Sequence, residues 1–124
     1  MYNAFTKEEI AMVKANLQAI KTYCTANIVP HLNRNESISV NANLDLPNRD
    51  ASFVVSGTGS ISLAIGNLVI GFTDVEDERC CDYMHLWPYA CKILPCWQEV
   101  KQKLHTSLDK KVALRHAMTD QFQI

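Results

Sequence analysis

The sequence predicts a single α+β domain over residues 1–124, with an N-terminal helix, a four-stranded antiparallel meander, and two or three C-terminal helices packed on one sheet face. Three observations predict this class. Apolar residues recur at helical spacing in the first and last thirds of the chain. They alternate with polar residues in the middle third, where short turn motifs separate the alternating runs. No repeat, low-complexity tract or flexible linker marks a domain boundary.

The predicted N-terminal helix begins after Thr6, because Thr6 and Glu9 have the spacing of a capping box. In that motif each side chain accepts a hydrogen bond from the backbone N–H of the other residue. The apolar residues that follow form one stripe at three- and four-residue steps: Ile10, Val13, Leu17, Ile20 and Cys24. Pro30 disfavours helical geometry at the preceding residue, so we expect the helix to end near residues 26–28.

The clearest predicted strand lies within residues 36–46, where apolar and polar side chains alternate. The turn motifs that follow set the pairing of the strands. Across the turn at Gly66 and Asn67, the expected opposed pairs are Ile65 with Leu68, Leu63 with Ile70 and Ile61 with Phe72. Across residues 57–59, they are Val55 with Ile61 and Phe53 with Leu63. Across a loop at residues 47–50, Leu44 is expected to oppose Phe53. These side chains then share one strongly apolar sheet face, which predicts the side that the helices cover.

The last third of the chain predicts two helices and a short third one. Thr73 and the acidic residues after it suit the start of a helix, which Pro88 ends or kinks near residue 86. Pro95 marks the start of the next helix. Its apolar stripe comprises Trp97, Val100, Leu104 and Leu108. Asp109 is predicted to cap the terminal helix, whose apolar residues are Val112, Leu114, Ala117, Met118 and Phe122.

Composition excludes several function classes. The 124 residues include 12 Lys and Arg against 13 Asp and Glu, so a net charge of -1 gives no electrostatic footprint for nucleic acid or an anionic membrane. No apolar run is long enough to span a bilayer. Charged residues at 7–9 stand where a signal peptide needs apolar ones, and the odd number of cysteines, 5, favours a reducing compartment. We therefore expect a cytoplasmic protein, in the host cytoplasm if a phage encodes it.

Reactive side chains concentrate in one segment of the sequence. Its soft metal ligands are Cys80, Cys81, His85, Cys91 and Cys96. Zinc sites use short-spaced ligand pairs, whereas Pro88 and Pro95 separate single residues here. We therefore interpret the cysteines as small buried hydrophobes. The weak metal candidates are Cys81, His85, Cys91 and Cys96. A cysteine nucleophile with a histidine base has no marked activating environment, so we expect no cofactor and no catalytic set.

The same segment is acidic and aromatic. Its acidic residues are Asp74, Glu76, Asp77, Glu78 and Asp82. They could hold a hard cation, but acids in a first helical turn are also what the helix dipole favours. The aromatic residues are Tyr83, Trp87, Tyr89 and Trp97. Such residues are enriched in protein interfaces and are equally typical of cores. We interpret this segment as a second candidate surface for a protein partner.

The most informative feature is negative, because no residue from 51 to 73 is charged. The expected registers place half of this run on the outer face of the sheet, and sheets that face water are usually protected by charges. The candidate binding residues of this face are Ser39, Asn41, Asn43, Ser60, Ser62 and Thr73. We interpret the face as a surface for self-association or for a partner protein. A polar solvated sheet is the alternative interpretation.

These features favour a non-enzymatic binding protein that occupies or sequesters a protein partner and assembles with itself. A small domain without a catalytic motif is typical of the accessory proteins with which phages and mobile elements inhibit host machinery. A small metal-dependent or cysteine enzyme is the first alternative. The second is a carrier of a small, nucleotide-like ligand, bound between the sheet and the helices by Trp87, Trp97 or Arg115.

Overall fold

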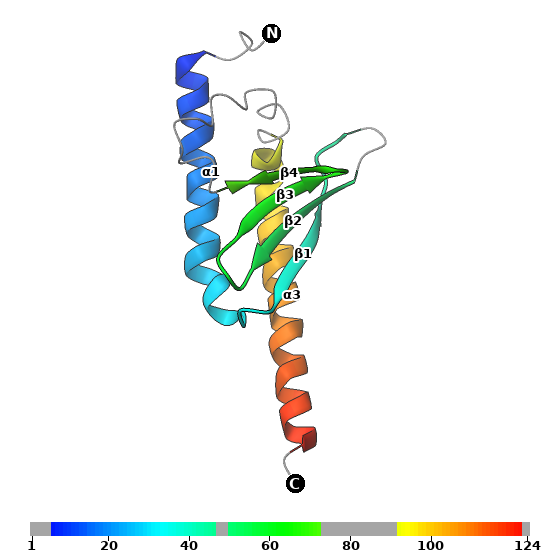
Figure 1. The fold of residues 1–124 in the computed structure, drawn as a ribbon. Coiled ribbons are helices and arrows are strands. Elements are labelled where there is room, and N and C mark those ends of the chain that lie inside the picture. Colours follow the sequence, from blue (N-terminus) through cyan, green and yellow to red (C-terminus); the bar gives the residue numbers. More distant parts are fainter. Residues whose placement is uncertain (1–5, 47–49, 73–91, 123–124) are drawn as a thin grey trace.

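A computed structural model describes residues 6–46, 50–72 and 92–122 of the chain (Figure 1). Its elements are α1 (Lys7–Asn27), a short 3₁₀ turn η2 (Val29–His31), β1 (Ser37–Ala42), β2 (Ala51–Ser56), β3 (Ile61–Ile65), β4 (Leu68–Gly71) and α3 (Ile93–Phe122). The strands form one antiparallel sheet in the order β1-β2-β3-β4. The predicted α+β class with a four-stranded meander is confirmed.

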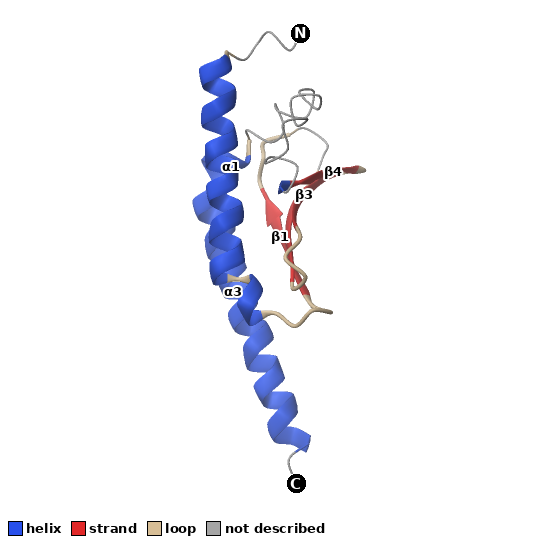
Figure 2. Ribbon diagram, turned by 60° about the vertical axis from the view of Figure 1, so that its left-hand side comes forward, coloured by secondary structure: helices blue, strands red, loops and turns tan. Residues whose placement is uncertain are grey.

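The described elements form two layers. Helices α1 and α3 lie on the same face of the sheet, and Figure 2 shows the strands beside both helices. No described element covers the opposite face, which we call the open face. Its outward positions are Ser37, Ser39 and Asn41 of β1, Ser52, Val54 and Ser56 of β2, Ser62 and Ala64 of β3, and Val69 and Gly71 of β4. The C-terminal part of α3 extends beyond the sheet.

Helix α1 begins and ends where local sequence signals place its ends. The Thr6 hydroxyl accepts from the Glu9 amide at 3.1 Å, and the Glu9 carboxylate accepts from the Thr6 amide at 3.2 Å. This is the predicted capping box. The helix ends at Asn27, shortly before Pro30, and the Ile28 amide closes the last turn on the Cys24 carbonyl at 2.9 Å.

The β2–β3 and β3–β4 hairpins have the predicted registers. Across the first, Phe53 opposes Leu63 and Val55 opposes Ile61. Across the second, Leu63 opposes Ile70 and Ile65 opposes Leu68. Gly66 has a φ of 58°, the left-handed conformation that a two-residue hairpin turn requires. Phe72 lies just after β4 and is buried, with its ring edge-on to Phe53 at a centroid distance of 5.5 Å.

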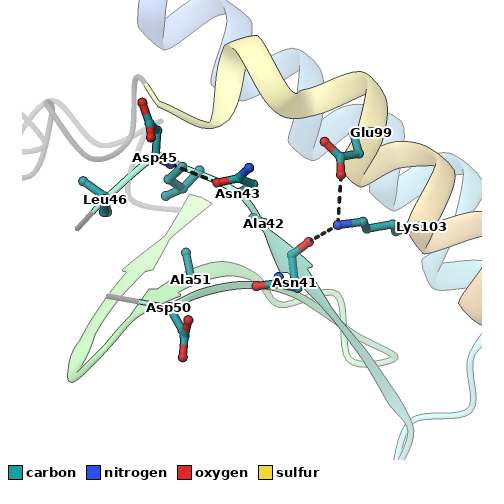
Figure 3. A pocket seen from close by; sticks show the side chains of 10 residues that line it. Asn41, Ala42, Asn43, Asp45, Leu46, Asp50, Ala51, Glu99 and Lys103 are labelled. Atoms are coloured by element: carbon teal, nitrogen blue, oxygen red, sulfur yellow. Dashed lines mark hydrogen bonds and ion pairs between the residues drawn. The ribbon is translucent and has the colours of Figure 1, made fainter. Parts of the chain in front are cut away.

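The predicted pairing of β1 with β2 is wrong by four residues, since Phe53 opposes Val40 and not Leu44. The inward side chains stay the same, because an even shift preserves the face of every residue. The register is held at the other end of the hairpin, where the Gly57 amide donates to the Glu36 carbonyl at 2.9 Å. The chain leaves the sheet after Ala42 and turns at Asp45, whose φ is 56° (Figure 3). The connection is therefore longer than the predicted loop.

The described C-terminal residues form one helix of 30 residues where a helix and a separate terminal helix were predicted. Pro95 is the third residue of α3, within the first turn, where its missing N–H costs no intrahelical bond. Asp109 lies inside the helix and caps nothing, because the apolar stripe continues past it from Leu108 to Val112. The helix predicted to start at Thr73 lies outside the described residues.

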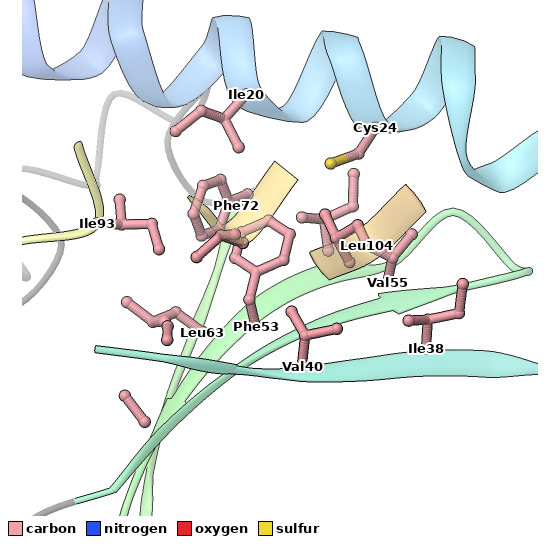
Figure 4. Packing of buried hydrophobic residues seen from close by; sticks show 14 of the residues in the cluster. Ile20, Cys24, Ile38, Val40, Phe53, Val55, Leu63, Phe72, Ile93 and Leu104 are labelled. Atoms are coloured by element: carbon pink, nitrogen blue, oxygen red, sulfur yellow. The ribbon is translucent and has the colours of Figure 1, made fainter. Parts of the chain in front are cut away.

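One hydrophobic core joins the two helices to the inward face of the sheet (Figure 4). Phe53, Val55, Leu63 and Leu104 are 0% exposed, and the stripe predicted for α1 supplies buried residues from its own side. Burial of each such side chain stabilises the fold by about 1.5–3 kcal/mol. Within the part of the chain that is described, no helix is both long and apolar enough to cross a bilayer.

Candidate functional site

The open face consists of small side chains arranged in straight rows across the sheet. One row runs through Ser39, Val54, Ser62 and Gly71, and the next through Asn41, Ser52, Ala64 and Val69. No side chain in either row is charged. Short side chains keep the surface flat, and their hydroxyl and amide groups can donate and accept hydrogen bonds. The arrangement suits contact with another flat and uncharged surface.

Several of the predicted binding residues lie on this face. Ser39 and Asn41 are exposed on β1, and Ser62 is half-buried in the interior strand β3. Ser60 precedes β3 in the hairpin, and its carbonyl accepts from the Ser56 amide at 2.9 Å, so it lies at the end of the face. Asn43 lies beyond the end of β1, where its side-chain oxygen accepts from the Asp45 amide at 3.3 Å.

The other predicted site residues lie outside the described residues, so their interpretation as a partner surface or as weak metal ligands stays a prediction. They are Thr73, Asp74, Glu76, Asp77, Glu78, Cys81, Tyr83, His85, Trp87, Tyr89 and Cys91.

Trp97 of the predicted aromatic surface packs partly into the core. Its ring centroid lies 5.7 Å from the ring centroid of Phe53 and 5.8 Å from that of Tyr23. The Tyr23 hydroxyl also lies 2.5 Å from His105 Nε2, which joins α1 to α3. Trp97 therefore takes the core role that its residue type also permits.

A polar hollow of about 340 Å³ lies where β1 ends against α3 (Figure 3). Lys103 bridges its rim, with its ammonium 3.2 Å from a Glu99 carboxylate oxygen and donating to the Asn41 carbonyl at 3.1 Å. Asp45 and Asp50 line the hollow from the β1–β2 connection. The sequence analysis missed this site, because its residues come from distant parts of the chain and form no motif.

Arg115, which the sequence offered as a ligand clamp, is bound within the chain. Its guanidinium donates to both carboxylate oxygens of Glu36 at 2.6 and 3.2 Å, and to the His31 carbonyl at 2.6 Å. The amide of Asn33 donates to the same carboxylate at 2.7 Å. This amide and the Arg115 guanidinium together hold the pKa of Glu36 below its ordinary value. The contact fastens α3 to the segment that leads into β1.

This contact predicts a pH dependence of stability. A carboxylate with a lowered folded-state pKa contributes stability above its ordinary pKa, and loses it as the pH falls through the lower folded value. Glu36→Gln should therefore reduce the stability difference between neutral and acidic pH, as measured by urea unfolding over a series of pH values. The double variant Glu36→Gln/Arg115→Gln should lose less stability than the sum of the two single variants, because both changes remove the contact that Glu36 and Arg115 share. Additive losses would contradict the coupling.

The cysteines in the described residues show no sign of metal binding or nucleophilic activation. Cys24 is 0% exposed, and burial raises the pKa of its thiol to about 12. Cys96 is half-buried, its thiol donates to the Ile93 carbonyl at 3.4 Å, and burial raises its pKa as well. A raised pKa leaves the thiol protonated and unreactive near neutral pH. No group of three or more His, Cys, Asp or Glu side chains in the described ranges could hold a metal ion.

The fold and the open face together define a two-layer α+β domain in which no described element covers one side of an uncharged sheet. The chain matches no protein-family model, no curated protein and no solved structure.

Proposed function

We propose that the protein is a non-enzymatic binding protein that occupies a partner protein through the open face. The observation that carries this proposal is the uncharged run from Ala51 to Thr73, whose described outward residues all lie on the side that no described helix covers. Exposed sheets that avoid association usually carry lysine or glutamate. The fit of the face to another flat, neutral surface supports a sheet of the partner as its counterpart.

Entropy also supports binding at this face. Ser, Ala and Val have few rotamers, so they lose little freedom when a partner covers them. The sheet ladder already fixes the backbone beneath them. A partner that docks here therefore gains contact area at a small ordering cost.

The size of the face implies that a protein partner bound to it would also contact its margins. Four strands spaced about 4.8 Å apart, with about five residues each at roughly 3.3 Å, cover on the order of 300 Å². A typical stable interface buries about 800 Å² on each partner. The neighbouring margin at the end of β1 contains the polar hollow, with Asp45, Asp50 and Lys103. Contacts there would add charge specificity to the neutral centre.

The proposal is tested by Ser62→Lys, which places a charge in the middle of the open face. The control is Gln18→Lys on the exposed side of α1, since it adds the same charge away from the sheet. A partner captured from the source cell is purified and titrated against both variants. We expect Ser62→Lys to weaken binding at least about tenfold, or roughly 1.4 kcal/mol, and Gln18→Lys to leave it unchanged. Equal binding by Ser62→Lys would contradict the proposal.

Native mass spectrometry in reducing buffer separates the other hypotheses. An added mass of one zinc ion per chain would favour the metal-dependent enzyme, and an added small molecule would favour the carrier. Wild type without either mass agrees with a binding protein. The accessory role against host machinery and the cytoplasmic location stay predictions from the sequence.

A further inference from the structure

We propose that two copies of this chain pair through the C-terminal half of α3, antiparallel about a two-fold axis, with Leu114 of each copy against Met118 of the other. This surface is separate from the open face. The proposal is an alternative to the self-association through the sheet that the sequence predicts, which stays a prediction, and it does not depend on the proposed function.

The first observation is an apolar pair on a helix that extends past the domain. Leu114 is 61% exposed and Met118 is 50% exposed. They lie four residues apart and so share one side of the helix. Both views of the fold show this part of α3 beyond the end of the sheet (Figures 1 and 2). Burial of two such side chains on each copy would contribute favourably to association.

The second observation is that Arg115 fixes the orientation of this helix. Its guanidinium holds Glu36 and the His31 carbonyl, so the side of α3 that carries Arg115 faces the body of the domain. Successive residues of a helix are turned by about 100° around its axis. Leu114 and Met118 therefore lie roughly 100° and 60° from Arg115, both in the same direction around the axis. The pair therefore projects sideways relative to the side of α3 that faces the domain, and a second helix can approach it there.

The third observation is charge complementarity, and it selects a second copy as the occupant. The last turn of α3 contains no basic residue, so the negative end of the helix dipole has no cation within that turn. When Leu114 opposes Met118, an antiparallel arrangement places Lys110 and Lys111 of one copy opposite residues 121–122 of the other. Each copy thus supplies the cations that the last turn of the other lacks. Parallel pairing would instead place these lysines beside each other.

The contact is short, and its length sets the expected affinity. Residues 109–122 span roughly 20 Å of helix. Two helices of this length bury less than the roughly 800 Å² per partner that a typical stable interface provides. We therefore expect a weak dimer whose population rises with protein concentration.

The test is sedimentation velocity of the full chain over roughly a hundredfold range of concentration. Wild type should shift from monomer to dimer. Leu114→Glu and Met118→Glu should each raise the dimer dissociation constant at least about tenfold. His116→Glu is the matched control, because this exposed residue lies between Leu114 and Met118 in the sequence but roughly 160° from both around the helix axis. Circular dichroism verifies that every variant is folded.

The direction of pairing has its own test in the double variant Leu114→Glu/Met118→Lys. Antiparallel pairing brings each new glutamate against a new lysine of the other copy, so the dimer should recover relative to the single variants Leu114→Glu and Met118→Lys. Parallel pairing would oppose like charges and give no recovery. Three results would overturn the proposal: wild type that stays monomeric throughout, single variants that dimerise like wild type, or a double variant without recovery. Loss of the dimer in Ser62→Lys but not in Leu114→Glu would assign self-association to the open face.

Discussion

Leu63→Asp is expected to abolish the folded state. Leu63 is 0% exposed in the interior strand β3, between Phe53 and Ile70 on the neighbouring strands. The substitution removes a buried apolar side chain and places a carboxyl group in a region without partners for it. Losing the side chain costs about 2–5 kcal/mol, and burying the polar group without a hydrogen bond adds several more. This sum is comparable to the whole stability of a typical domain, about 5–15 kcal/mol.

The control is Ser62→Asp, one residue earlier on the same strand. Its side chain lies on the open face, so the new carboxylate stays in contact with water and the domain should remain folded. Far-UV circular dichroism and a urea titration measure both variants. A cooperatively folded Leu63→Asp protein, or an unfolded Ser62→Asp protein, would show that the two faces of β3 are assigned wrongly.

Gly57→Ala is expected to destabilise the domain by about 3 kcal/mol, because the new methyl group has no space. A Cβ atom at Gly57 would lie 1.9 Å from the carbonyl oxygen of Asn33 and 2.7 Å from its carbonyl carbon. Both are backbone atoms, and the same oxygen already accepts from the Glu36 amide at 2.9 Å. The segment before β1 must therefore move away. This movement weakens the hydrogen bond that sets the register between β1 and β2.

Gly66→Ala is the matched control for this prediction. No atom lies within 4 Å of a Cβ built at Gly66, so the only cost is the left-handed φ of 58°. That cost is roughly 1–2 kcal/mol for alanine. Urea unfolding should therefore rank wild type above Gly66→Ala and Gly66→Ala above Gly57→Ala. Equal losses in the two variants would mean that the close approach to Asn33 contributes nothing.

Local sequence signals predicted those parts of the fold that depend on few neighbouring residues. The capping box at Thr6 and the end of α1 before Pro30 involve contacts within one or two turns. The hairpin at Gly66 involves two adjacent strands and a turn that glycine favours. The same alternation identified the open face, including Ser39, Asn41 and Ser62, because it assigns each strand residue to a side.

Contacts between distant segments decided what these signals left open. The register between β1 and β2 could shift by two or four residues without changing any face, and the hydrogen bond from the Gly57 amide to the Glu36 carbonyl holds one alignment. Likewise, Arg115 binds Glu36, 79 residues earlier, so the chain itself supplies a carboxylate to Arg115.

The sequence by itself determined the fold class, both ends of α1, two of the three strand registers and the uncharged character of one sheet face. The tertiary structure alone decided the pairing of β1, the continuity of α3 through Asp109, and the flank on which Leu114 and Met118 are exposed. The physical reason is the range of the interactions. The interactions that form helix caps and turns, and the alternation that assigns strand faces, involve residues only a few positions apart in the sequence. Strand register and helix orientation depend on contacts between residues that only the packed chain brings together.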